Sequence, residues 1–368
     1  MTIEDLALQL TPRLGVKGIV HLLEVFGDAR AIFAASREEL IGRAELSPTV
    51  ADTLLHRSGF AAAERELRYC HKHQIEPIAS TDAAYPQLLR EIPDYPHIIY
   101  IQGDPAALNG QLLSVVGTRS ASSYGEEQCT RLIRELGERI PQLVVVSGLA
   151  YGIDGAAHRA ALSYGVRTVA VVANTLPNIT PALHSRMARE IVDKGGVVMS
   201  ELHSEAKQKG VFYLARNRLI AGLSAGTILI ESPASGGSLN TAAHADSYHR
   251  TVMAMPGRPT DRQAQGTNHL IRTHKAQLIS SAADVIEELQ WDLGSDPALF
   301  EEKPATEQLT RDEAGLLCCF RTSDPLSLEE LRDLTGLDMG NLTALLVGLE
   351  LAGKLKLLPG NRYMKRCD

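Results

Sequence analysis

The chain has 368 residues, of which 44% are hydrophobic and 22% charged, so it is long enough for two or three domains with at least one large core. Its net charge of -7 at pH 7 excludes a polybasic protein that coats nucleic acid non-specifically, although it is compatible with a local basic groove. None of the five cysteines forms a C-x-x-C pair, which argues against a zinc site or a disulfide framework.

The N-terminal region predicts a cytoplasmic protein that begins with a helical module. The first residues, "MTIEDLALQL", lack the basic start and apolar core of a signal peptide, and no apolar run reaches the roughly 18 residues of a membrane span. Over residues 1–70, apolar residues recur at three- and four-residue spacing between Pro and Gly breaks, which predicts short helices. Residues 71–110 follow as a connector, whose prolines favour an extended path.

Residues 111–291 show a different pattern, in which short β-branched runs alternate with helix-like segments. The runs are "LLSVV", "LVVVS", "TVAVV", "GVVMS", "TILIE", "TVMAM" and "AQLIS", and the helix-like segments are 124–139, 154–164, 181–194 and 237–249. Strands that are apolar on both faces are typical of a parallel sheet covered by helices on each side. We therefore expect a doubly wound, mainly parallel α/β domain, with its ligand at the carboxyl ends of the strands.

The C-terminal region predicts a small separate module. Residues 292–309 are acidic and unpatterned, as in a linker. Residues 310–368 contain three helical patterns, of which "LSLEELRDLTG" and "DMGNLTALLVGLELAG" are joined by a short turn, followed by the basic hairpin "KLKLLPGNRYMKR". This order is typical of a winged-helix domain. The hairpin cations could lie along a duplex, but the preceding helices are acidic, which favours a protein-interaction or modulatory role. The cations are Lys354, Lys356, Arg362, Lys365 and Arg366, and the acids are Glu329, Glu330, Asp333, Asp338 and Glu350.

Turns rich in Gly, Ser and Thr follow four strands of the α/β domain. They begin at Gly117, Ser147, Ser235 and Pro256. Glycine lets the backbone approach an anion closely, and Ser or Thr hydroxyls and helix N-termini can bind phosphate oxygens. Each turn alone is better explained by helix capping, since strand-to-helix turns use Gly and Ser for caps. Because the turns converge on one edge of the sheet, together they favour an anion site, at which Arg119 adds a cation.

The stretch "KQKGVFYLARNRLIAGLS", residues 207–224, indicates which kind of anion the predicted site binds. The dinucleotide fingerprint G-x-G-x-x-G and the P-loop pattern are absent from the turns, so no nucleotide cofactor is expected. Lys207, Lys209, Arg216 and Arg218 surround Phe212 and Tyr213, and this mixture suits single-stranded nucleic acid. The alternative is a solvated loop leading into a helix, with arginines that pair with carboxylates at the sheet edge.

Residues suited to catalysis are few. Asp154 and His158 lie at i, i+4 and could share a helix face, and His184 and His244 might line the same cleft. A helix-borne histidine in such a place is more often a structural hydrogen-bonding residue. Glu231 is the one acid at a strand end, and it could equally cap a neighbouring N–H. The sequence therefore favours a binding protein over an enzyme.

Five stretches in the α/β domain resemble the DNA processing protein A family, bacterial recombination mediators linked to natural transformation. They are "VVGTRSASSYG", "VVSGLAYGIDGAAHRAAL", "ARNRLIAGLS", "GGSLNTAAHA" and "VMAMPGRPTDRQAQGTNHLI", in the family's order. The resemblance implies an extended Rossmann-like fold between a helical SAM- or HhH-like module and a winged-helix domain. It also implies a non-enzymatic homodimer that binds single-stranded DNA, protects it and helps load a RecA-type recombinase.

The family's DNA-contacting positions can be carried over residue by residue. The turn and segment motifs of the family correspond here to Gly117, Thr118 and Arg119, then Ser147 and Gly148, then Arg216, Asn217 and Arg218, and finally Gly237, Ser238 and Thr241. Tyr213 stands where the family has phenylalanine and keeps a stacking face, while Lys209 adds a nearby cation. Tyr151 replaces an arginine of the family pattern and so removes one possible phosphate partner.

The alternative function is that of an enzyme. Hydrolases that cleave nucleoside monophosphates between the sugar and the base have a similar fold. Their P-G-G-x-G-T-x-x-E loop supplies a glutamate for acid–base chemistry. The corresponding loop here reads "ASGGSLNTAAHAD", in which the two possible registers place Ala243 or His244 at that position. A general acid or base needs a titratable group within reach of the bond, so the sequence disfavours this alternative.

Overall fold

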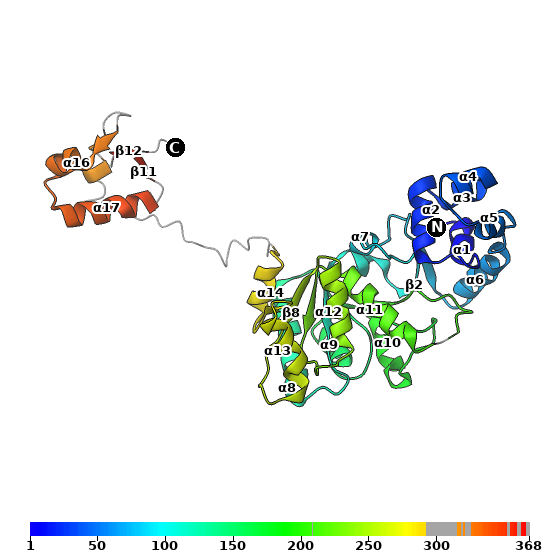
Figure 1. Ribbon diagram of the computed structural model, residues 1–368. Helices are drawn as coiled ribbons and strands as arrows, with labels where there is room; N and C mark the ends of the chain where they lie inside the picture. Colours follow the sequence, from blue (N-terminus) through cyan, green and yellow to red (C-terminus); the bar gives the residue numbers. More distant parts are fainter. Residues whose placement is uncertain are drawn as a thin grey trace. The chain divides into compact units, whose positions relative to one another are not determined.

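The computed structural model describes residues 1–207, 209–291, 315–317, 319–320, 325–351, 354–358 and 362–365. The chain forms two compact units, Met1–Asp292 and Leu293–Asp368, which are described separately below (Figure 1). The expected linker at 292–309 lies outside the described residues. No described helix is long and apolar enough to cross a membrane.

The first unit is built on a nine-stranded sheet with the order β1-β2-β6-β5-β4-β3-β7-β8-β9. Its strands are β1 (Glu76–Ala79), β2 (Ile98–Gly103), β3 (Gln111–Val116), β4 (Leu143–Ser147), β5 (Arg167–Val171), β6 (Val197–Ser200), β7 (Gly226–Leu229), β8 (Thr251–Ala254) and β9 (Gln277–Leu278). Within the run from β6 to β9 in this order, every adjacent pair of strands is parallel. The expectation of a doubly wound, mainly parallel sheet is thereby confirmed.

Residues 71–110 contribute structure that the sequence analysis did not assign to the sheet. Strand β2 pairs antiparallel with β6, and β1 pairs antiparallel with β2. The side chains of Ile98, Ile99, Tyr100 and Ile101 are all buried. The apolar run "HIIYI" therefore forms a buried strand between β6 and the edge strand β1, and other parts of the chain pack on it.

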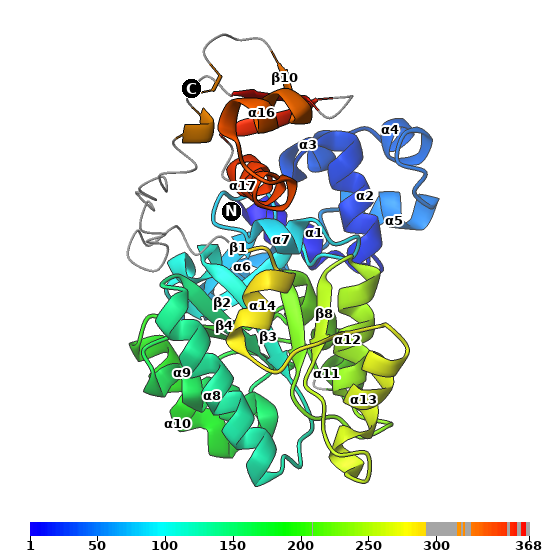
Figure 2. The ribbon, with the colours of Figure 1, turned by 90° about the vertical axis from the view of Figure 1, so that its left-hand side faces the viewer.

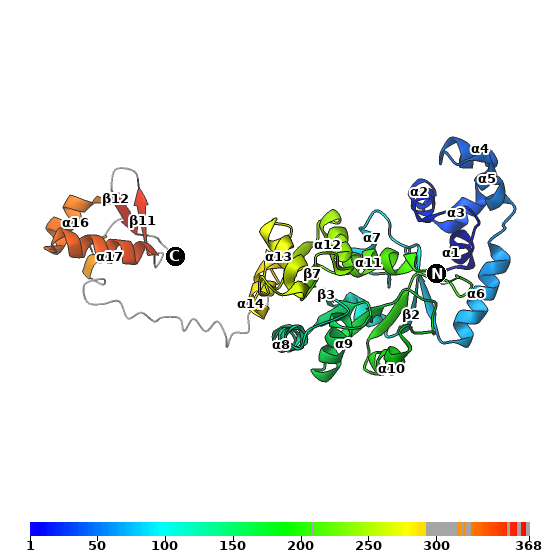
Figure 3. The same cartoon turned by 60° about the horizontal axis from the view of Figure 1, so that its bottom comes forward.

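Helices cover both faces of the sheet (Figures 2 and 3). One face carries α8 (Ser123–Arg139), α9 (Ile153–Ser163), α10 (Ser185–Asp193) and α14 (Ala282–Glu288), and the other carries α7 (Gln87–Arg90), α11 (Val211–Leu223), α12 (Ser238–Ser247) and α13 (Gln265–Arg272). Three short 3-10 turns complete the unit: η1 (Pro105–Asn109), η2 (Ala182–His184) and η3 (Arg262–Ala264). Two apolar cores separate the layers, one on each face. The helix-like segments of the sequence analysis correspond to α8, α9, η2 with α10, and α12.

Six N-terminal helices pack at the end of the sheet formed by β1 and β2. They are α1 (Ile3–Gln9), α2 (Val16–Phe26), α3 (Ala29–Ala34), α4 (Arg37–Gly42), α5 (Pro48–Leu55) and α6 (Phe60–Lys72). They share a core of their own, which includes Leu22 and Leu40. A second core joins Leu6 and Ala63 to Tyr100 on β2, so this helical module is packed directly on the sheet.

The second unit contains the elements expected of a winged-helix module. They are β10 (Leu326–Ser327), α16 (Leu328–Thr335), α17 (Met339–Leu351), β11 (Leu355–Leu358) and β12 (Arg362–Lys365). Strand β12 lies between β10 and β11 and is antiparallel to both. Leu331, Leu342, Leu346 and Leu355 form a small core between the helices and the hairpin. The hairpin turn at 359–361 lies outside the described residues.

Candidate nucleic-acid interface

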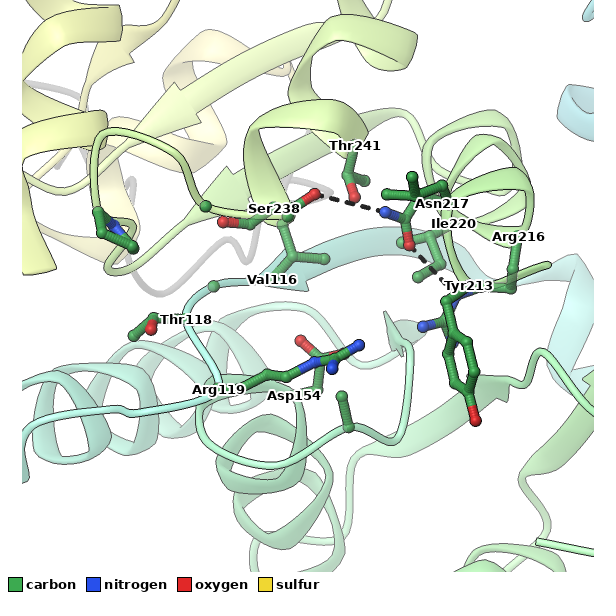
Figure 4. A pocket seen from close by; sticks show the side chains of 16 residues that line it. Val116, Thr118, Arg119, Asp154, Tyr213, Arg216, Asn217, Ile220, Ser238 and Thr241 are labelled. Carbon is green, nitrogen blue, oxygen red and sulfur yellow. Dashed lines mark hydrogen bonds between the residues drawn. The ribbon is translucent and has the colours of Figure 1, made fainter. Parts of the chain in front are cut away.

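A cavity of about 390 Å³ opens where the order of the parallel strands reverses (Figure 4). Strands β3 and β7 are neighbours, but the chain leaves them towards opposite halves of the sheet, and such a switch point is where open α/β sheets bind ligands. The cavity is lined by residues that follow β3, β4 and β7, together with one side of α11. Three of the four turns singled out in the sequence therefore meet at one site, whereas the fourth, which begins at Pro256, does not line this cavity.

Nine of the thirteen predicted site residues line this cavity. They are Gly117, Thr118, Arg119, Tyr213, Arg216, Asn217, Gly237, Ser238 and Thr241. Tyr213, Arg216 and Asn217 lie within α11 and not in a loop before it, because the helix begins at Val211. Helical geometry fixes the relative positions of these three side chains.

Gly117 allows the turn after β3 to pack tightly. A Cβ atom at this position would lie 2.8 Å from the Glu231 carbonyl oxygen and 2.6 Å from a side-chain carbon of Ile153. The Thr118 N–H donates to the same Glu231 carbonyl at 2.7 Å. The Ser120 N–H donates to the Thr118 hydroxyl at 3.2 Å, so this hydroxyl already stabilises its own turn.

The N-terminus of α8 is occupied by a carboxylate of the chain itself. Ser122 is the N-cap, and Glu231 accepts hydrogen bonds from its N–H at 2.9 Å and its hydroxyl at 2.5 Å. A helix N-terminus favours an anion, and here Glu231 is that anion. Glu231 therefore acts as a cap, the second of the two roles left open by the sequence. A phosphate in the cavity must rely on other groups.

Arg119 and Tyr213 meet across the cavity from different elements (Figure 4). The guanidinium carbon of Arg119 lies 5.8 Å from the centre of the Tyr213 ring, within the range of a cation–π contact. Arg119 is exposed and Tyr213 is half-buried. The pair offers an exposed cation and an aromatic face at the same point.

Arg216 is a buried cation that lines the floor of the cavity. One Nη atom donates to the Gly148 carbonyl at 2.7 Å and to the Val171 carbonyl, and Nε donates to Asn217 Oδ1 at 3.3 Å. Burial lowers the pKa of Arg216, an effect that the nearby Asp154 opposes. Burial likewise raises the pKa of Asp154, which accepts the Gly148 N–H at 3.2 Å. The two charges therefore stabilise each other beneath the cavity.

The other predicted residues, Ser147, Gly148, Lys209 and Arg218, do not line the cavity. The buried hydroxyl of Ser147 donates to the Val115 carbonyl at 2.7 Å, inside the sheet. Gly148 lies against the Arg216 guanidinium, and Lys209 is an exposed residue that precedes α11. Their contact with DNA stays a prediction.

Arg218 lies in a buried ionic cluster apart from the cavity. It forms ion pairs with Glu201 and, at 3.7 Å, with Asp94, and burial raises the pKa of Glu201. Tyr248 donates to Asp94 at 2.7 Å. This arrangement matches the alternative in which an arginine of this stretch pairs with carboxylates at the sheet edge. The cluster ties α11 to the end of β6 and to α12.

The three histidines singled out in the sequence also lie outside the cavity lining. His158 is buried and shares a 2.8 Å hydrogen bond between Nδ1 and the Thr168 hydroxyl, and burial lowers its pKa to about 3. The Nδ1 atom of His184 lies 2.8 Å from the Leu149 carbonyl oxygen. His244 stacks on Tyr248. These contacts give all three a structural role.

Sequence reasoning missed the apolar part of the cavity wall. Leu214 and Ile220 on α11 line it together with Val116 at the end of β3. No motif marks these residues, but the helical spacing of Tyr213, Arg216, Asn217 and Ile220 could have shown that they share a face. Asp154 was noted only as a partner for His158, whereas it also lines the cavity.

Comparisons with known proteins agree with the fold and the motifs. The model of the DNA recombination-mediator protein A family matches residues 76–290, and that of the DprA winged helix domain matches residues 300–361. Protein Smf of Escherichia coli is 32% identical over 291 residues, which cover 77% of this chain and 76% of that protein.

Two solved structures are also similar. The X-ray structure of DNA processing protein A from Streptococcus pneumoniae has a TM-score of 0.68 at 29% identity and covers 78% of this chain and 98% of that one. DNA processing protein A from Helicobacter pylori, whose structure is described for its single-stranded DNA binding mode, has a TM-score of 0.53 at 28% identity. It covers 59% of this chain and 96% of that one. The family match spans more than half of this chain, which therefore belongs to the DNA recombination-mediator protein A family.

Proposed function

We propose that this chain binds single-stranded DNA in the cavity between β3 and β7 and acts there as a recombination mediator. The observation that carries the proposal is the Arg119–Tyr213 pair at the switch point of the sheet. A cation can neutralise a phosphate and an aromatic ring can stack on an unpaired base, and both lie at one place. The relative from Helicobacter pylori, described as binding single-stranded DNA, supports the same ligand.

The charges around the cavity suit a phosphate backbone better than a reaction centre. Of its described lining residues, Arg119 and Arg216 are cationic and Asp154 is the one carboxylic acid. Asp154 is buried and accepts the Gly148 N–H, while Glu231 caps α8. Cleavage of a sugar–base bond needs an acid or base in reach of the substrate, so the hydrolase alternative gains no support. We propose a binding function without catalysis.

The wider role follows from the family. We propose that the protein forms a homodimer, protects incoming single strands and helps load a RecA-type recombinase onto them. The contacts are to phosphates and to base faces, so binding is expected to tolerate different sequences. We propose that Lys209, which precedes α11, contributes a further cation for a DNA phosphate. Arg218 instead stabilises α11 through its ion pairs with Glu201 and Asp94.

The test is a salt titration of oligonucleotide binding, followed by fluorescence anisotropy. Arg119→Ala should weaken binding to unrelated single strands alike, and it should reduce the slope of log K against log salt by about 0.7, the value for one lost phosphate contact. Arg134→Ala is the matched control, because Arg134 is an exposed arginine on α8 outside the cavity lining. An unchanged slope in Arg119→Ala would remove the basis of the proposal.

A further inference from the structure

A second cavity lies beside α10, at the end of the sheet formed by β2 and β6 and away from β3 and β7. Its volume is about 970 Å³, against about 390 Å³ for the proposed DNA cavity, and the two share no lining residue. It is bounded by α10, by the end of β2 and by the loop that follows β5. Pockets that hold a whole small ligand usually measure roughly 300–1,000 Å³, so this cavity is large enough for such a ligand.

One wall of this cavity is a single face of α10. The residues of that face recur at spacings of three and four, namely Ser185, Ala188, Arg189, Val192 and Asp193. This spacing places them on the same side of the helix. The helix rises by about 12 Å from the first of them to the last, so the cavity suits an elongated ligand whose two ends differ in chemistry.

The two charged residues of this face, Arg189 and Asp193, have no partner among the described residues. Both are exposed and lie one helical turn apart, yet no ion pair or hydrogen bond joins either side chain to the other or to another part of the described chain. Asp193 is the last residue of α10, where the helix dipole disfavours an acid. The stability of the helix therefore does not account for this pair, whereas a ligand with an anion and N–H donors would.

The cavity has an acidic end around Asp193. Asp104 lies there, because its N–H donates at 3.2 Å to the carbonyl of Gly196, which directly precedes β6. One carboxylate oxygen of Asp104 caps η1 at 2.9 Å, which orients the group. The amide of Gln102 donates to the His73 carbonyl at 3.0 Å, which fixes this side chain as well. This end therefore offers carboxylate and amide oxygens, which accept N–H donors.

The opposite end of the cavity favours an anion. Arg189 lies towards it, and the hydroxyl of Ser185 and the amide of Asn178 line it as well. The first turn of α10 contains no acid, and its N-cap residue His184 makes no capping hydrogen bond with its side chain. A guanidinium can bind a phosphate through two parallel N–H bonds, and the hydroxyl and amide add donors.

We propose that this cavity binds a guanine mononucleotide, with its base at the end of Asp104 and Asp193 and its phosphate at Arg189. The guanine edge carries two adjacent donors, N1–H and the N2 amino group, which one carboxylate accepts together. Val192 and Val198 line the same part of the cavity and give the base an apolar surface. The proposal does not depend on the proposed function, because the DNA cavity is a separate site.

The test is a calorimetric titration of the full chain with guanosine monophosphate, inosine monophosphate and guanosine. Arg189→Ala should lower the affinity for guanosine monophosphate about tenfold and leave the affinity for guanosine unchanged, because guanosine has no phosphate. Inosine monophosphate lacks the N2 amino group, so the unchanged protein should bind it about tenfold more weakly than guanosine monophosphate. Asp193→Asn should remove this preference.

Both variants should fold normally, because each loses a charge without a described partner and neither is buried. Their melting temperatures should equal or exceed that of the unchanged protein. Arg134→Ala and Asp246→Asn are the matched controls, since both residues are exposed on helices outside the cavity lining, and both variants should bind guanosine monophosphate normally.

Three results would overturn the proposal. They are the absence of guanosine monophosphate binding at millimolar concentration, normal binding by Arg189→Ala, and equal affinity of the unchanged protein for the two monophosphates. A loss of guanosine monophosphate binding in Arg119→Ala would also overturn it, because the nucleotide would then lie in the DNA cavity. Single-stranded DNA binding should stay unchanged in Arg189→Ala and Asp193→Asn, so the fate of this site is independent of the DNA site.

Discussion

Glu66 on α6 fixes Ser204, which lies in the segment between β6 and α11. The Ser204 N–H donates to both carboxylate oxygens of Glu66, at 2.9 and 3.0 Å, and its hydroxyl donates to one of them. Next to this contact, Arg65 pairs with Glu205 at 2.9 Å on the surface. The helical module is thus bonded to the segment that leads into α11, the helix that carries Tyr213 and Arg216.

Glu66→Ala should therefore weaken both the fold and the DNA site. Glu66 is buried, and its removal leaves the Ser204 donors without their acceptor, at a cost of about 1–3 kcal/mol. The loosened segment should also lower the affinity for single-stranded DNA. Arg65→Ala, which breaks only the exposed ion pair with Glu205, should change stability much less, because solvent screens such a pair. Denaturant unfolding and anisotropy measure both effects, and equal behaviour of the two variants would contradict the anchoring role.

Gly148→Ala tests whether the position of Arg216 matters for binding. The new Cβ atom would lie 2.6 Å from an Nη atom of Arg216, which is itself bonded to the Gly148 and Val171 carbonyls. The guanidinium must move, so we expect a loss of affinity for single strands of severalfold, and a loss of stability of about 1–3 kcal/mol. Gly42→Ala is the control, because nothing lies within 4 Å of its added Cβ atom. Normal DNA binding by Gly148→Ala would show that the floor of the cavity does not contribute.

Because His158 is buried, we expect the folded protein to lose stability in acid. Its pKa falls from 6.5 to about 3 on folding, chiefly because burial disfavours the charged ring. Between these values the unfolded chain binds one more proton than the folded chain, so stability decreases as the pH falls below 6.5. This single group contributes about 1.4 kcal/mol per pH unit in that range. In His158→Gln the contribution is absent, so the stability difference between the two proteins should shrink as the pH falls from 6.5 to 4. A difference that stays constant would contradict the assignment.

The C-terminal unit is expected to contribute little to duplex binding. Helix α17, which would be the recognition helix of a winged-helix domain, has the sequence MGNLTALLVGLEL and so contains no lysine or arginine. Acidic side chains at Glu329, Glu330 and Asp338 are exposed near it. We therefore expect a chain that ends at Asp292 to bind duplex DNA as the whole chain does. A tenfold loss at low salt would instead assign duplex binding to the hairpin cations.

Much of the fold follows from local patterns in the sequence. The β-branched runs, the glycine turns and the helix periodicity predict the parallel sheet and a ligand site at the carboxyl ends of its strands, because each signal is local to a few residues. Strands β1 and β2 escaped notice, since their pairing at the sheet edge depends on distant contacts with β6 and the N-terminal helices. Helix α11 was not among the helix-like segments named from the sequence, because a basic and aromatic stretch looks alike in a loop and in a helix.

In the candidate site, too, some features could be predicted from local sequence and others depend on distant contacts. Arg119, Tyr213 and Arg216 are grouped in the sequence analysis by composition and by the family motifs, and all three line one cavity. The pattern could not separate Arg216 from Arg218, which are two residues apart and so project in different directions from α11. Only the folded chain shows that Glu201 and Asp94 surround Arg218. The capping of α8 by Glu231 likewise depends on two segments more than 100 residues apart in sequence.

The central claim is that a single strand lies across the cavity beside Tyr213. Photo-cross-linking with an oligonucleotide that contains 5-iodouracil, followed by peptide mass spectrometry, tests this location directly, because the cross-link forms with an aromatic side chain in contact with the base. We predict a cross-link in the peptide that contains Tyr213, reduced by Arg119→Ala and retained in Arg134→Ala. Cross-links confined to the C-terminal unit or to the N-terminal helices would contradict the claim.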